Sequence, residues 1–207
     1  MLSEIRIGPS TSTDGPVNPA RGGRTGALIA ADAHGRYWEA CSRGEVFVAA
    51  NTGAQATSTA SATATRLILT NPVNSGKVFE IIDVTVGVGA VVAAAFEVGM
   101  FAGFYSATAV THTTPITPRC ALIGMTTLPT GLVDSAATLP VAPTHIRTLL
   151  ASGWVTATAQ SQEVAKDEIA GAIGLLPGCS LSIQSVVGTQ SCITSITWRE
   201  QPLAVAS

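Results

Sequence analysis

Acid–base chemistry would fall to residues that stand far apart in this sequence. The histidines are His34, His112 and His145, and no two of them are close together. A site that used them would depend on the fold to assemble it, so we expect each to be a polar loop residue. Asp167 and Glu168 are adjacent, but neighbours on a strand point to opposite faces. We therefore expect a solvated pair and not a general acid and base.

Motifs that bind nucleotides or build hydrolase sites are incomplete or missing. Residues 75–77 read Ser-Gly-Lys, but Val78 follows where a phosphate-binding loop needs a magnesium-binding hydroxyl. Residues 87–89, Gly-Val-Gly, begin a dinucleotide fingerprint whose third glycine is replaced by Val92. The sequence has no G-x-S-x-G and no H-E-x-x-H motif. It predicts no catalytic residue, no cofactor-binding residue and no cofactor, so we expect a protein that is not an enzyme.

The thiols give no sign of a metal site. The four cysteines are Cys41, Cys120, Cys179 and Cys192. None forms a C-x-x-C pair and no histidine lies at ligand spacing, so we expect no metal. If residues 188–191 are a hairpin loop, Cys192 lies opposite about Val187 and Cys179 lies near the far end. We therefore expect mostly unpaired thiols, reduced in a cytoplasm, with a single disulfide as the alternative.

The composition is that of a protein with large contact surfaces. The chain has 207 residues, of which 46% are hydrophobic and only 12% charged, about half the usual charged share of roughly 25%. The mean hydropathy is +0.40. Small uncharged residues must therefore cover the surface or be buried against partners. Removing such residues from water costs little free energy, which favours contacts with other proteins.

Charge and hydropathy argue against nucleic acid and membrane as partners. The net charge is −2, only two residues are lysine, and the nine arginines are scattered. No basic stripe is available to neutralise phosphates. The apolar stretch 84–104 contains four glycines and Glu97, which argues against a spanning helix. The first four residues do not begin a signal peptide.

The first residues differ from the rest of the chain. Residues 1–26 are rich in Pro, Gly, Ser, Thr and Asn and show no hydrophobic period, so we expect an extended N-terminal arm. Residues 27–207 are expected to form one β-sandwich domain. Within the arm, Arg6, Arg21 and Arg24 can make forked contacts with carboxylates of a partner, and we expect them at an assembly interface.

Short runs of alternating polarity after residue 27 predict strands. Three segments stay ambiguous: 52–65 is a loop or a flat strand, 145–155 a strand or a helical turn, and 163–169 a short helix or a loop. About eight or nine strands with long loops predict an all-β fold, a β-sandwich of the jelly-roll type. The expected strands are 36–41, 45–49, 66–70, 77–88, 93–105, 121–123, 169–175, 181–187 and 195–199.

Three stretches of the sequence resemble structural proteins of tailed bacteriophages. They are residues 20–27 with 34–39 and 43–47, residues 69–77 leading into a valine-rich strand, and residues 176–202. Together they cover roughly half of the chain, and none is a catalytic motif. The pattern is similar to capsid decoration (cement) or head-fibre proteins. The resemblance implies a jelly-roll trimer on a virion surface, and it transfers no functional residue.

The expected function is therefore non-enzymatic. The chain would decorate and stabilise a phage capsid as a homotrimer, bound to the major capsid protein or another virion protein, after synthesis in the host cytoplasm. A neck, tail or fibre component is the first alternative. A carbohydrate-binding jelly roll is the second, since tryptophans can stack on sugars, although we expect them to fill a core or an interface. The tryptophans are Trp38, Trp154 and Trp198.

Overall fold

The computed structural model describes residues 4–6, 17–19, 35–57, 61–89, 95–105, 110–152 and 164–203. Their contacts divide the chain into two units, Met1–Trp38 and Glu39–Ser207. In the first unit, β1 (Glu4–Arg6) pairs antiparallel with β2 (Val17–Pro19). Both strands lie within the segment that the sequence predicts to be an extended arm.

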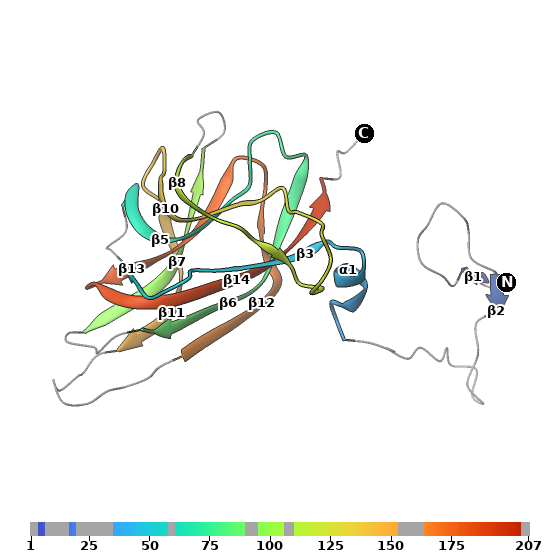
Figure 1. Ribbon diagram of the computed structural model, residues 1–207, viewed down its shortest axis with the longest axis horizontal. Helices are drawn as coiled ribbons and strands as arrows, with labels where there is room; N and C mark the ends of the chain where they lie inside the picture. The colour runs from blue at the N-terminus through green and yellow to red at the C-terminus, as the bar shows by residue number, and fades with distance from the viewer. Residues whose placement is uncertain are drawn as a thin grey trace. The chain divides into compact units, whose positions relative to one another are not determined.

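The second unit is a sandwich of two antiparallel sheets (Figure 1). The all-β prediction is confirmed. Apart from the short helix α1 (Trp38–Ser42), the regular elements of its described residues are strands. They are β3 (Val46–Ala50), β4 (Gln55–Thr57), β5 (Thr63–Thr70), β6 (Lys77–Val88), β7 (Phe96–Phe104), β8 (Thr111–Ile116), β9 (Arg119–Cys120), β10 (Leu132–Thr138), β11 (Thr144–Ser152), β12 (Val164–Leu175), β13 (Cys179–Val187) and β14 (Gln190–Pro202).

The chain passes repeatedly from one sheet to the other. Sheet I has the order β11-β7-β13-β5-β10-β8, and sheet II has the order β12-β6-β14-β3-β9, with β4 beside β14. Consecutive strands β5, β6 and β7 alternate between the sheets, and so do β12, β13 and β14. Strands that are distant in sequence thereby become neighbours, as where β14 pairs with both β3 and β6.

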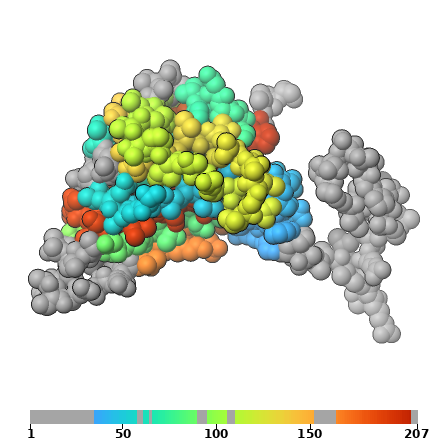
Figure 2. All heavy atoms as spheres, viewed as in Figure 1, coloured from blue at the N-terminus to red at the C-terminus, as the bar shows by residue number. Residues whose placement is uncertain are grey.

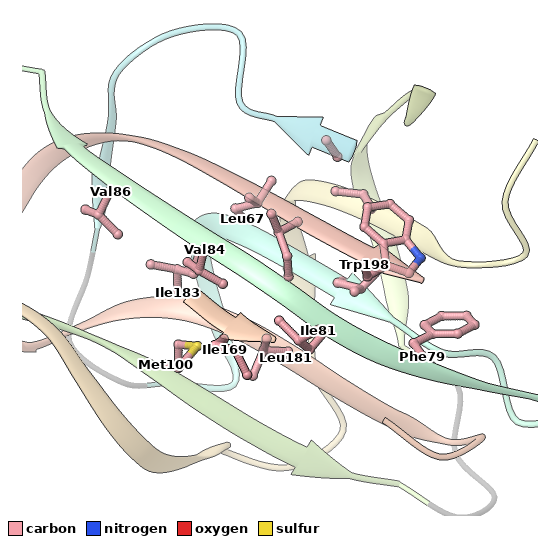
Figure 3. Packing of buried hydrophobic residues seen from close by; sticks show 14 of the residues in the cluster. Leu67, Phe79, Ile81, Val84, Val86, Met100, Ile169, Leu181, Ile183 and Trp198 are labelled. Atoms are coloured by element: carbon pink, nitrogen blue, oxygen red, sulfur yellow. The ribbon is translucent and has the colours of Figure 1, made fainter. Parts of the chain in front are cut away.

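The main core lies between the sheets and follows from the period of two along each strand. On β14, Cys192, Ile196 and Trp198 point inward and are almost fully buried, while the residues next to Ile196 and Trp198 are partly exposed. Figure 3 shows inward side chains of both sheets meeting, among them Ile81 and Ile183. Such burial contributes about 1.5–3 kcal/mol for each large apolar side chain.

A β-bulge in β6 changes which residues face this core. Thr197 pairs with Asp83 and the next residue, Trp198, pairs with Ile81, so Ile82 is the extra residue. Ile81 and Val84 are both fully buried, although residues three apart on a regular strand point to opposite faces. The alternation of inward and outward residues that is expected along a strand at 77–88 is therefore broken at this point.

The segment 36–41, predicted as a strand, instead leads into helix α1. The amide of Arg43 donates to Glu39 O at 3.2 Å and that of Gly44 to Cys41 O at 2.9 Å. Gly44 ends the helix with φ 71°, a left-handed conformation that glycine adopts without steric cost.

Residues 121–123, predicted as a strand, are a turn between β9 and β10. This turn segment covers the start of β3, where Ala121 N donates to Val46 O and Val46 is only 2% exposed. In Figure 2 it forms the yellow atoms that lie against the blue ones. Ile123 itself is 88% exposed.

The predicted hairpin around residues 188–191 is also wrong. β13 and β14 belong to different sheets, so this connection crosses the sandwich. Gly188 makes the turn with φ 71°. Of the ambiguous segments, 145–155 forms strand β11 over its described residues. Segment 163–169, predicted as a short helix or a loop, is instead the first part of strand β12 from Val164 onward, because it pairs with β6. The described part of segment 52–65 contains strand β4 and the start of β5.

Candidate binding pocket

A pocket of about 420 Å³ opens on the outer face of sheet I. On β5, Leu67 and Leu69 point into the main core, so Ile68 and Thr70 point to this outer face. The polar residues lining the pocket are Thr70, Asn71, Asn74, Tyr105 and His112, and the others are Pro72, Val73, Val110, Leu132 and Gly178. We call it the His112 pocket.

A second, smaller hydrophobic cluster supports this pocket. It contains Ile68, Tyr105, Val110, Ala137 and Leu139, all less than 8% exposed. Tyr105 and Val110 belong both to the cluster and to the pocket lining. The pocket therefore rests on packed side chains, which hold its wall in a fixed shape.

The described residues bring one histidine and one carboxylate together here. His112 lies on β8 and Asp134 on the neighbouring β10, and His112 Nδ1 is 2.5 Å from Asp134 Oδ2. The register of the two strands shifts between Asp134 and Ala136, so the usual one-to-one pairing is broken at this site. Asp134 is fully buried, whereas the His112 side chain is 30% exposed. A second hollow is also lined by His112 and Leu132, together with Asp134.

Three buried oxygen atoms, of two residues that line the pocket and of the carboxylate that pairs with His112, have no hydrogen-bond partner within the described parts of the chain. They are Thr70 Oγ1, Asn71 Oδ1 and Asp134 Oδ1. The orientation of the Asn71 amide is fixed, because its Nδ2 donates to Lys77 O and to Leu175 O, both at 2.9 Å. Its Oδ1 is then an acceptor without a donor. A buried polar atom in this state costs about 1–3 kcal/mol.

Tyr105 and Arg66 add polar groups to the same side of sheet I. Ser180 Oγ donates to Tyr105 Oη at 3.0 Å, and burial raises the pKa of Tyr105. Arg66 is 1% exposed, and its guanidinium nitrogens have no partner among the described residues. Burial lowers the pKa of Arg66 to about 10. Arg66 does not line the His112 pocket.

The remaining histidines and the acidic pair form no such group within the described structure. His145 packs against Phe101 with ring centroids 4.9 Å apart. Asp167 pairs with Arg147 at 2.6 Å, and Glu168 is exposed, so the two carboxylates do not act together. His34 lies outside the described residues.

The residues predicted at an assembly interface are mostly beyond the described structure. Arg6 is the last residue of β1, and only its backbone is described. Arg21 and Arg24 lie outside the described residues. Their proposed role stays a prediction.

The tryptophans in the described structure differ in how far they are buried. Trp198 fills the core, with its ring centroid 5.9 Å from that of Phe47, as predicted. Trp38 is 47% exposed in α1, and Trp154 lies outside the described residues.

The pocket is large enough to hold a small ligand. A His–Asp pair can orient a base, but the described residues place no hydroxyl or thiol in hydrogen-bond contact with His112. The same residues contain no group of three potential metal ligands. Sequence analysis does not find the His112–Asp134 pair, because its members stand 22 residues apart on two strands that it does not predict.

Among the described residues, no helix is long and apolar enough to cross a membrane. No family model, no curated protein and no solved structure matches this chain.

Proposed function

We propose that this chain is a non-enzymatic structural protein of a tailed-bacteriophage virion, which decorates the capsid surface and stabilises it. It would act as a homotrimer bound to the major capsid protein or to another virion protein. A neck, tail or fibre component is the alternative within the same class.

The outer face of sheet II is the observation that carries this proposal. Lys166 and Asp83 on this face pair at 3.8 Å, and Thr197 Oγ1 donates to the same Asp83 at 2.9 Å. Arg199 pairs with Glu45 at 2.8 Å. Each of these charged side chains is therefore paired with an opposite charge of the same protein. A partner that covers this face does not have to supply the opposite charges itself.

One end of this face is apolar. Val164 on β12 and Ile193 on β14 both pair with Gly87 of the strand between them, which places the three residues in one row. Val164 is 73% exposed and Ile193 48%. A Cβ atom on Gly87 would lie 3.7 Å from Val164 Cγ2. Because glycine has no side chain, nothing projects from the surface between Val164 and Ile193. Exposed apolar rows of this kind suit protein contacts.

The strand order supports the jelly-roll type. In sheet II the first long strand, β3, pairs with the last, β14, and β6 and β12 follow on the far side of β14. In sheet I, β5, β13, β7 and β11 stand in the corresponding order. Each sheet therefore combines early and late strands, as double-sheet jelly rolls do.

Two measurements test the proposal. The first is cryo-electron microscopy of the phage particle whose genome encodes this chain. We expect copies repeated over the capsid lattice, whereas a few copies at one vertex would favour the neck or tail alternative. Absence from the particle would overturn a virion function.

The second measurement is the oligomeric state and the role of the arm. Light scattering should give three times the 21.0 kDa chain mass. Deletion of residues 1–24 should preserve the β-sheet circular dichroism and reduce occupancy on particles. Full occupancy after the deletion would show that Arg6, Arg21 and Arg24 do not contribute to attachment.

The apolar row can be tested with matched variants. Ile193→Lys should weaken trimerisation or capsid occupancy at least tenfold. Ile146→Lys, at a 44% exposed position on the other sheet, should not. Equal effects of the two changes would remove the outer face of sheet II from the proposal.

A further inference from the structure

Strand β8 is the outermost strand of sheet I and is held on one side only. It pairs with β10, and the described structure places no further strand beyond it (Figure 1). The register shifts twice along this pairing, between Asp134 and Ala136 and between Ala136 and Ala137. Five of the six residues of β8 are exposed, and one of them is Pro115, which has no amide to donate. Few backbone contacts therefore hold β8, and a side-chain contact can decide whether it stays paired.

The side-chain contact that joins these two strands is the one between His112 of β8 and Asp134 of β10. His112 Nδ1 lies 2.5 Å from Asp134 Oδ2, and the Asp134 side chain is completely buried. The second oxygen of this carboxylate, Oδ1, has no hydrogen-bond partner within the described residues. A carboxylate that is removed from water needs a positive charge close by. A protonated imidazole supplies that charge, whereas a neutral imidazole supplies only a hydrogen bond.

The strands on either side of this pair offer Asp134 no other counter-charge. The sequence of β8 contains no titratable side chain besides His112, and that of β10 contains none besides Asp134. On β5, the other neighbour of β10, Arg66 is buried, but its guanidinium nitrogens have no hydrogen-bond partner in the described structure. Arg119 follows β8 along the chain but lies exposed on β9 of sheet II. The proton on His112 is therefore the charge that can compensate Asp134.

The remaining titratable groups near these strands keep their charge state around neutral pH. Burial raises the pKa of Tyr105 and that of Cys179, so both groups stay uncharged. Glu200 accepts a hydrogen bond from the segment before β10 and pairs with Lys77 at 2.8 Å. Its donors hold the pKa of Glu200 below the ordinary value, so this carboxylate is ionised throughout the neutral range. Among the described residues near β8, His112 is thus the side chain of the type that changes charge there.

We propose that β8 is a pH-sensitive edge strand, which protonated His112 holds against the buried Asp134 carboxylate and which detaches from β10 when His112 loses its proton. The folded form uses this proton, so the contribution of the pair is present at low pH. It is lost as the pH rises through the range in which an imidazole deprotonates, about pH 5–8. Detachment lets water reach Asp134 and draws Val110, which directly precedes β8, away from the cluster that it shares with Ile68. This device goes beyond the proposed structural function, and its failure would leave that function untouched.

The test is hydrogen–deuterium exchange of the full chain at about pH 6 and about pH 8.5, followed by mass spectrometry and corrected for the intrinsic exchange rate. The protection of the segment that contains β8 should fall at least about tenfold between the two pH values. The segment that contains β6 should keep its protection, because β6 pairs with a strand on each side. Both pH values lie above the ordinary pKa of a carboxyl group, about 4, so the titration of exposed carboxylates does not contribute.

Three variants locate the effect. Asp134→Asn keeps the shape of the side chain and removes its charge, so the protection of β8 should no longer depend on pH. His112→Gln carries no charge at any pH, so β8 should exchange at pH 6 as fast as the wild-type strand does at pH 8.5. If His112→Gln does not fold, Asp134→Asn decides alone, because an amide needs no counter-charge. The control is His145→Gln, on β11 at the opposite edge of sheet I, which should behave as the wild type.

Three results would overturn the proposal. The first is equal protection of wild-type β8 at the two pH values. The second is an unchanged pH dependence of this protection in folded Asp134→Asn protein. The third is loss of the pH dependence in His145→Gln, which would assign the effect to that histidine.

Discussion

Glu200 offers the sharpest test of how this sandwich is held together. Its side chain is 1% exposed, and its two oxygens accept four hydrogen bonds. Oε1 accepts from Gly131 N at 2.8 Å and from Trp198 Nε1 at 3.3 Å. Oε2 accepts from Lys77 Nζ at 2.8 Å and from Thr130 N at 3.0 Å. The carboxylate thereby joins β14 to the start of β6 and to the segment before β10.

The change Glu200→Gln alters this network at nearly constant volume. The remaining oxygen can still serve Gly131 and Trp198. The new amide group, however, places donors against the donors of Lys77 and Thr130. Lys77 is 36% exposed and keeps access to water, which limits its share of the loss. We expect the free energy of unfolding to fall by about 3 kcal/mol.

For a domain of this size, such a loss lowers the Tm by about 6–12 °C. Urea unfolding followed by tryptophan fluorescence measures it, because Trp198 is fully buried in the folded state. The matched control is Glu168→Gln, the same change at an exposed strand position. It should alter stability by less than about 0.5 kcal/mol.

The pH dependence gives an independent check. Burial alone would raise the pKa of Glu200, but the donors from Lys77, Thr130, Gly131 and Trp198 outweigh burial and hold this pKa below its ordinary value. A depressed folded-state pKa stabilises the protein above the unfolded value of about 4.3. This stability is lost as the pH falls through the folded pKa. The variant should lack this part of the acid transition, and a Glu200→Gln protein with wild-type stability and an unchanged pH profile would refute the reasoning.

Two further predictions concern the core and the thiols. Ile81→Ala, at a fully buried position, should reduce stability by about 2–5 kcal/mol. Ile123→Ala, at an 88% exposed position, should change it by less than about 0.5 kcal/mol, and similar losses in urea unfolding would contradict the placement of these residues. Burial raises the pKa of Cys192 to about 11, so in the native protein this thiol should react with a disulfide reagent at pH 8 far more slowly than the half-buried Cys41. After denaturation without reductant, all four thiols should react, and a count near two would reveal a disulfide.

The sequence predicts strands better than it predicts their partners. A period of two identifies a strand that faces a core, and β6 and β14 are found in this way. It does not say to which sheet a strand belongs. Residues 181–199 read as a hairpin because two alternating segments flank a short turn at Gly188, yet a crossing between sheets gives the same pattern. The prediction that Cys179 and Cys192 lie too far apart for a disulfide assumes that hairpin, so the geometry on which it was based is wrong. The four thiols are nevertheless unpaired in the structure.

The misassigned short segments have a common cause. Residues 36–41 and 121–123 are apolar enough for strands, but each is too short for its period to be decisive. Tertiary contacts decide instead, as where Gly44 ends α1 and the turn after β9 covers Val46. Strand β8 escapes prediction for the opposite reason. Its residues are mostly exposed and polar, so no apolar alternation marks them.

The candidate site is even less accessible to sequence analysis. The sequence predicts that His112 is a loop residue. The fold instead places it on β8, beside Asp134, in a pocket that Thr70 and Tyr105 also line. Pairing of β10 with both β5 and β8 brings these positions together, and such long-range pairing leaves no local signal.

The two outer faces of the sandwich differ in exposure and in polarity. On sheet I, Ser180, Ser182 and Gln184 point outward on β13 but are at most 1% exposed, so this face is covered and keeps a layer of buried polar groups. On sheet II, Val164 and Ile193 point outward and stay exposed. The polar groups of the covered layer on sheet I are satisfied within the protein, as where Gln184 Nε2 donates to Ser182 Oγ at 2.7 Å. An open face with internally paired charges favours a broad protein contact. A polar variant in the exposed row of sheet II should therefore affect assembly and leave the stability of the covered layer on sheet I unchanged.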